Sequence, residues 1–128
     1  DLDANTWRMS LFTSASNFAT ATLSVVSEVT NEVSEANGYS SSGKALSGVT
    51  WATGASASEM RFDSTAVIWT GTGGAISNVK AAVVWKEGAS AGARKLMGYM
   101  TLSTSQFNVG TGNTLTVTPS ANGYWELN

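Results

Sequence analysis

Residues 76–87 read Ile-Ser-Asn-Val-Lys-Ala-Ala-Val-Val-Trp-Lys-Glu, and Ala81–Trp85 within them is the longest uninterrupted apolar run of the chain. A short run of small, β-branched and aromatic residues bounded by turn residues is typical of a strand buried in a sheet. The segment Gly88–Gly92 follows directly and predicts a loop. We therefore expect residues 76–87 to form the central strand of the fold.

Shorter apolar runs lie on both sides of this segment, separated by stretches rich in Gly, Ser, Thr, Ala and Asn. The expected strands are Thr6–Phe12, Lys44–Thr53, Glu59–Asp63, Ala66–Thr70, Arg94–Ser103, Leu115–Thr118 and Tyr124–Leu127. Short strands with turn signals every ~8–12 residues are typical of a β-sandwich or a small barrel. We predict an all-β protein, an antiparallel β-sandwich of seven to nine strands, with residues 1–128 forming a single domain.

One segment has a different periodicity. In residues 22–35, valines recur near helical spacing and glutamates recur at intervals of four and three. β-branched side chains crowd a helix, so a long helix is disfavoured here. We expect one short helix around Thr22–Glu28 and at most one or two short helices in the whole chain.

Tryptophan is the most informative residue type, and each of the five tryptophans lies inside a short apolar run: Trp7, Trp51, Trp69, Trp85 and Trp125. Such rings belong to a core or to a subunit interface, whereas a row of exposed tryptophans would stack on sugar rings. The predicted core contains Leu11, Val49, Trp69, Val83, Trp85, Met97, Tyr99 and Leu115.

Catalytic chemistry has few candidate residues, because the chain contains no His and no Cys. The commonest general base, the thiol nucleophile and the softer metal ligands are therefore missing. The acidic groups are Asp1 with Asp3 at the terminus, Glu28, Glu32 and Glu35 on one expected solvated face, and Glu59 with Asp63 flanking Arg61 on one strand. None of these patterns indicates the convergent carboxylates of a glycosidase.

Binding motifs for ions and phosphate are equally sparse. The chain has no Asp-x-Asp-x-Asp loop for calcium. Gly71–Gly74 lacks the Gly-Lys-Ser/Thr that follows in a phosphate loop, so it predicts a wide hairpin loop. We expect no enzymatic activity, no catalytic residue, no cofactor and no metal.

Charged residues make up only 12% of the chain, and the formal net charge is −2. A nucleic-acid-binding protein needs a clustered basic face, which the seven scattered Lys and Arg residues do not provide. No apolar stretch approaches the ~20 residues of a membrane-spanning helix. We therefore predict neither nucleic acid nor membrane as a partner.

Six ordered segments point to a family: Asp3–Phe12, Glu32–Tyr39 with Gly43–Val49, Arg61–Thr70, Ala81–Lys86, Leu96–Met100 and Gly123–Leu127. In this order they resemble a family of small virion structural proteins of tailed bacteriophages. Leu96-Met97-Gly98-Tyr99-Met100, for example, is similar to the Leu-Ile-Gly-Tyr-Ile segment of that family. The family also has a stretch upstream of its first strand, and Thr111–Pro119 is only a loose match.

The resemblance implies a structural protein on the surface of the phage particle, without a catalytic site. We expect a capsid decoration or cement protein that bridges capsid subunits. The alternative is a receptor- or glycan-binding module associated with the tail or with a head fibre. Low surface charge and the number of aromatic strands lead us to expect a homo-oligomer, or many copies on a symmetric lattice.

The predicted partner contacts lie near loops and chain ends: Asp3, Asn5, Trp7, Tyr39, Trp51 and Trp125. The aromatic members of this set are also the candidates for glycan stacking in the alternative. We expect Asp1–Asn5 to act as an anchor that lies across a neighbouring subunit, since the first strand begins directly at Thr6.

Overall fold

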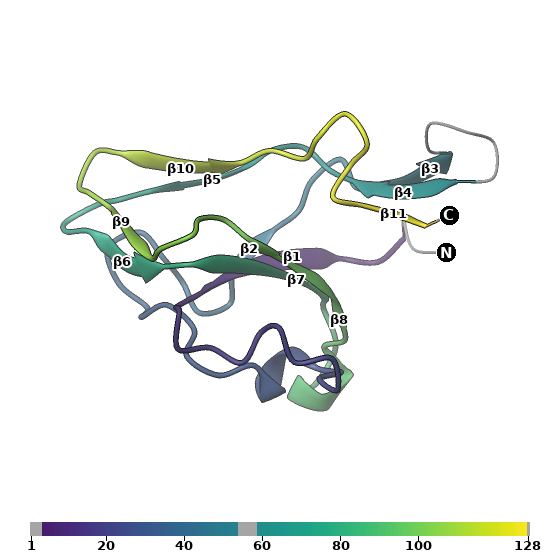
Figure 1. Ribbon diagram of the computed structural model, residues 1–128, viewed down its shortest axis with the longest axis horizontal. Coiled ribbons are helices and arrows are strands. Elements are labelled where there is room, and N and C mark those ends of the chain that lie inside the picture. The colour runs from purple at the N-terminus through teal and green to yellow at the C-terminus, as the bar shows by residue number, and fades with distance from the viewer. Residues whose placement is uncertain (1–3, 54–58, 128) are drawn as a thin grey trace.

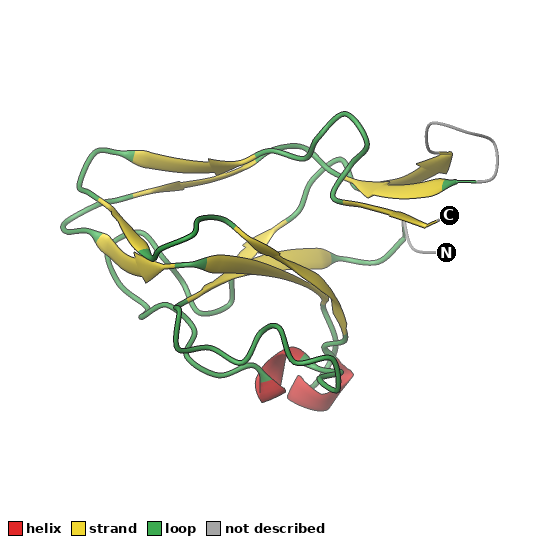
Figure 2. Ribbon diagram, viewed as in Figure 1, coloured by secondary structure: helices red, strands yellow, loops and turns green. Residues whose placement is uncertain are grey.

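The computed structural model describes residues 4–53 and 59–127, and within them it contains strands and two single turns of 3-10 helix. The all-β prediction is therefore confirmed. The strands are β1 (Trp7–Phe12), β2 (Lys44–Ala45), β3 (Thr50–Thr53), β4 (Met60–Asp63), β5 (Val67–Thr70), β6 (Ile76–Val79), β7 (Ala81–Lys86), β8 (Leu96–Thr101), β9 (Phe107–Val109), β10 (Thr114–Val117) and β11 (Trp125–Leu127). The turns are η1 (Val26–Glu28) and η2 (Ala91–Ala93), and they lie side by side (Figure 2).

The strands form two layers (Figure 1). One layer contains the four-stranded sheet β2-β1-β7-β8 and the pair β6-β9, and the other contains the pair β10-β5 and the three-stranded sheet β11-β4-β3. Every pairing between these strands is antiparallel. β7 lies between β1 and β8, so the most apolar segment of the sequence occupies the centre of the largest sheet, as predicted.

The predicted strand 76–87 is divided in two. The break lies at Lys80. The residues before it form β6, which pairs with β9 and is irregular around Asn78 (left-handed, φ 62°), and the residues after it form β7 of the four-stranded sheet. The predicted strand Lys44–Thr53 is divided in the same way, at Gly48 (φ 59°). These divisions, together with the unpredicted β9, give eleven strands in the described residues instead of seven to nine.

The helix predicted at Thr22–Glu28 is reduced to the single turn η1. The carboxylate of Glu28 accepts hydrogen bonds from the backbone N–H groups of Ser24 (2.8 Å) and Val25 (3.3 Å). These bonds close the turn at its start. Val25 is extended and pairs with Lys95 in an isolated bridge, which explains why the helix does not begin earlier.

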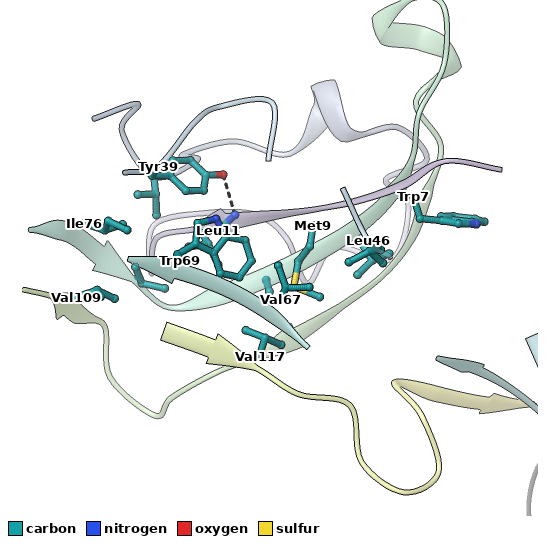
Figure 3. Packing of buried hydrophobic residues seen from close by; sticks show 14 of the residues in the cluster. Trp7, Met9, Leu11, Tyr39, Leu46, Val67, Trp69, Ile76, Val109 and Val117 are labelled. Atoms are coloured by element: carbon teal, nitrogen blue, oxygen red, sulfur yellow. Dashed lines mark hydrogen bonds between the residues drawn. The ribbon is translucent and has the colours of Figure 1, made fainter. Parts of the chain in front are cut away.

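The main core lies between the two layers (Figure 3). Met9 and Leu11 of β1 meet Trp69 of β5, and none of the three side chains is exposed. Of the predicted core, Leu11, Trp69, Val83 and Trp85 are buried, and Val49, Met97 and Leu115 are partly buried against the core.

Tyr99 was predicted to be a core residue, but 42% of it is exposed. Tyr99 lies opposite Val83, on the face of the sheet that is turned away from the main core. A second, smaller cluster covers that face, formed by Phe12, Val29 and Val83 with residues of the 18–26 segment. β8 is the edge strand, so this cluster covers Tyr99 incompletely, and the ring of Phe18 packs against it.

Candidate functional site

Phe62 is the centre of an aromatic cluster, which we call the Phe62 cluster. Its fully buried ring lies 5.3–6.3 Å, centroid to centroid, from four other rings, those of Trp7, Trp51, Tyr124 and Trp125. Trp51 and Trp125 lie directly opposite Phe62 on the two neighbouring strands. Cross-strand aromatic pairs stabilise a sheet, so the cluster joins β3, β4 and β11 and attaches them to β1 through Trp7.

The Phe62 cluster also contacts β8, at Gly98. A Cβ atom at Gly98 would lie 2.8 Å from the ring of Trp125, which is too close for any side chain. The glycine therefore provides the space that Trp125 occupies. Packing against Trp125 therefore explains why the Leu-Met-Gly-Tyr-Met segment has a glycine at position 98.

The predicted contact residues occupy very different positions. Trp7 and Tyr39 are only 4% and 3% exposed, so neither presents a ring face on which a sugar could stack. Trp51 and Trp125 are half-buried members of the Phe62 cluster, and Asn5 is half-buried as well. Asp3 and the start of the proposed anchor lie outside the described residues, and contact with a partner through Asn5, Trp51 or Trp125 stays a prediction.

Tyr39 belongs to a buried polar network (Figure 3). Its hydroxyl donates to a carboxylate oxygen of Glu32 (2.6 Å) and accepts from the backbone N–H of Leu11 (2.9 Å). Burial, more than any other effect, raises the pKa of Glu32, and burial followed by the bond to Glu32 strongly raises the pKa of Tyr39. The network fixes the 32–39 segment to β1.

The other two glutamates of the expected solvated face are exposed, and each binds backbone nearby. Glu35 accepts hydrogen bonds from the hydroxyl and the N–H of Ser41, and these bonds lower its pKa. The pKa of Glu28 is lowered chiefly by the N–H groups of Ser24 and Val25. The prediction of a solvated face thus fails for Glu32, because the segment is not helical and Glu32 is turned toward β1.

A groove of about 320 Å³ lies between β8 and the loop that precedes η1. It is lined by Phe18, Ala19, Thr20, Ala21, Leu23, Val83, Leu96, Met97, Gly98 and Tyr99. The rings of Phe18 and Tyr99 lie 5.2 Å apart and are tilted by 57°. The groove has the size and partly apolar lining of a small-ligand site, and sequence reasoning missed it because Tyr99 was assigned to the core.

Charge is unevenly distributed along the chain. Residues 64–79 and 96–125 contain no Asp, Glu, Lys or Arg. These stretches contain β5, β6, β8, β9 and β10, of which β5, β6, β9 and β10 gather at one end of the molecule (Figure 1). We call β5, β6, β9, β10 and their connecting loops the neutral end.

Two lysines from outside these stretches reach toward the neutral end. The ammonium group of Lys44 donates to the carbonyl of Ile68, and that of Lys80 donates to the carbonyl of Thr104. The exposed surface at this end is otherwise made of Thr, Ser, Asn and Gly, with Ile68 (48% exposed) as its large apolar residue. The absence of charge in residues 96–125 is the sequence signal that could have identified this surface.

Among the described residues, no three Asp or Glu side chains gather where they could hold a metal ion, and no helix is long enough to cross a membrane. The chain matches no protein-family model, and no curated protein and no solved structure is significantly similar to it.

Proposed function

We propose that this chain is a structural protein of a tailed-phage virion, and that it acts on the particle surface as a capsid decoration or cement protein. The ordered resemblance of its segments to small virion proteins supports the proposal. The neutral end is the structural observation that favours an assembly role.

The physical argument concerns desolvation. Burying a charged group at an interface costs several kcal/mol unless the group is paired, whereas hydroxyl and amide groups find hydrogen-bond partners at lower cost. The neutral end can therefore be covered by capsid subunits with few new ion pairs, because its strands carry no charge and the ammonium groups of Lys44 and Lys80 are already bonded to carbonyls. A protein that binds only the assembled shell stabilises the shell through binding linkage.

The experiment uses particles from which the chain has been removed. We expect stripped particles to keep their assembled shell but to disrupt at a lower temperature, and purified chain added back should restore heat resistance. Rebinding of Ile68→Glu, which introduces a charge at the neutral end, should be weaker than rebinding of Ser27→Glu, which places the same charge on exposed η1. Stripped particles that resist heat as well as intact ones would contradict the cement role and favour a tail location.

A glycan-binding module of the tail or of a head fibre is the second candidate, and the groove beside Tyr99 is the observation that favours it. An exposed aromatic ring can stack on the apolar face of a sugar, and the Thr20 and Tyr99 hydroxyls at the groove can bind sugar hydroxyls. On a glycan array, Tyr99→Ala should lose the signals that the unmodified chain gives, while Ile68→Ala should retain them. An array without signals would exclude this candidate.

A further inference from the structure

β10 is an edge strand whose outer side has no neighbour. It pairs only with β5, and it lies at the rim of the molecule (Figure 1). The N–H of Gly71 donates to the carbonyl of Asn113. Along an antiparallel pair, every second residue of a strand bonds to its partner strand, and this bond shows which residues of β10 do so. Leu115 and Val117 therefore bond to β5, and the backbone N–H and C=O groups of Thr114 and Thr116 point outward.

Nothing in the described part of the chain uses these outward groups, since no hydrogen bond to the backbone of Thr114 or Thr116 is formed outside the β5 ladder. Natural proteins protect such edges with charged side chains, with prolines or with bulges. β10 has none of these along its length, and the nearest proline is Pro119, after the strand ends.

Two other edges are partly occupied. On the opposite edge of the same ribbon, the ammonium group of Lys44 donates a hydrogen bond to the carbonyl of Ile68 on β5. β8 is the other long uncharged edge, but its first residue is covered, because the N–H of Leu96 donates to the carbonyl of Ser24 (3.0 Å). The unprotected edge of the two-stranded ribbon is therefore β10.

The distribution of charge indicates which partner fits the open edge of β10. The chain carries a formal net charge of −2, so two copies repel one another least when they meet at surfaces without acidic groups. The outer edge of β10 is such a surface, since residues 64–79 and 96–125 carry no charge and the ammonium group of Lys44 lies on the opposite edge of the ribbon, at Ile68 of β5. A strongly basic or acidic partner would find no complementary group there, whereas an identical edge offers matching donors and acceptors.

We propose that β10 pairs with β10 of a second copy, antiparallel and across a two-fold axis, and joins two β5–β10 ribbons into one four-stranded sheet. The pairing places Thr116 opposite Thr116 of the second copy, and Thr114 opposite Thr118. The exposed side chains of Ile68 and Thr116, which are cross-strand neighbours, then form one continuous uncharged row with their counterparts. The inference concerns the isolated chain and does not rest on the virion role.

Sedimentation velocity of the full chain over about 1 µM to about 1 mM tests the pairing, a range that covers weak strand-mediated association. We expect a concentration-dependent monomer–dimer equilibrium. Thr116→Lys should raise the dissociation constant by at least about tenfold, because it places two like charges opposite one another. The matched control is Thr70→Lys, which adds the same charge to an exposed position on β5, away from the edge, and should change the constant by less than about twofold.

A second variant at the same position shows whether an effect of Thr116→Lys comes from the edge or from misfolding. Thr116→Pro removes only an outward N–H, a position at which an edge strand tolerates proline, and it should also abolish the dimer. Hydrogen exchange adds an independent measurement, because the amides of Thr114 and Thr116 should become protected as the concentration rises. A chain that stays monomeric at every concentration overturns the proposal, as does a dimer that both folded variants leave unchanged.

Discussion

The hydroxyl of Tyr39 lies 2.6 Å from a carboxylate oxygen of Glu32 and donates a hydrogen bond to it. The same hydroxyl accepts the N–H of Leu11 on β1, so one phenol connects a half-buried acid to the central sheet. Burial raises the pKa of Glu32 above 4.5, the ordinary value for this group. The pair therefore makes part of the stability of the protein depend on pH.

The first prediction concerns Glu32→Gln. Because the pKa of Glu32 is raised in the folded state, the folded protein binds the proton more tightly than the unfolded chain, and stability falls as pH rises from about 4.5 through the raised pKa. Glutamine carries no such proton. Urea unfolding at several pH values should show the variant gaining stability relative to the unmodified protein as pH rises, with a plateau above the raised pKa.

Glu35→Gln is the control for that experiment, because the pKa of Glu35 is lowered instead. Its carboxylate contributes stability above pH 4.5 that is lost as pH falls through the lowered pKa, so the difference should have the opposite sign. A stability difference for Glu32→Gln that is constant across pH would show that burial does not perturb Glu32.

The second prediction concerns Tyr39→Phe. Removing the hydroxyl leaves the buried N–H of Leu11 without an acceptor and removes one of the hydrogen-bond donors to Glu32, which should cost about 1–3 kcal/mol in the free energy of unfolding. Tyr99→Phe removes the same atom from a ring that is 42% exposed and should change stability by less than about 0.5 kcal/mol. Equal effects of the two substitutions would contradict the role assigned to Tyr39.

The third prediction concerns Gly98→Ala. The added methyl group would overlap the ring of Trp125, which must shift and loosen the Phe62 cluster, at a cost of about 1–3 kcal/mol. Gly92→Ala is the matched control, since a Cβ atom there meets nothing within 4 Å. Denaturant unfolding measures both variants, and tryptophan fluorescence should change only for Gly98→Ala.

The fourth prediction concerns Phe62→Ala. Four aromatic rings surround this fully buried side chain, so its removal should cost about 3–5 kcal/mol and can unfold the domain at moderate temperature. Ile68→Ala removes a large apolar side chain that is 48% exposed, and its effect on the melting temperature should be small. A small loss for Phe62→Ala would mean that the cluster does not hold the layers together.

Sequence patterns predicted the strands in which apolar residues alternate regularly or follow one another without interruption. Alternation identified β1, and the apolar run Ala81–Trp85 identified β7, because both patterns depend only on neighbours in the chain. The division at Lys80 was not predicted, because it depends on which strand each half pairs with. β6 bonds to β9, where Asn78 is left-handed and its N–H is bonded to the side chain of Asn108, whereas β7 joins the four-stranded sheet.

Side-chain environments that depend on distant strands were harder to predict. Tyr99 has the sequence context of a core residue, and only the edge position of β8 exposes it. Glu32 has the spacing of a solvated helix face, and contacts with distant residues bring it to β1, namely its bridge to Phe12 and the bond from the N–H of Val33 to the carbonyl of Leu11. For the neutral end, the absence of charge in residues 96–125 is visible in the sequence, but the topology decides which uncharged segments gather.

The Phe62 cluster has a consequence for how the chain folds. Trp7 comes from the first strand and Trp125 from the last, and both rings pack on the same phenylalanine. Contacts between residues far apart in the sequence require long loops to close, and they slow the search for the native state. During synthesis the Phe62 cluster cannot be completed until β11 has been made, and until then the apolar side chains that it covers on β1 and β4 are open to aggregation.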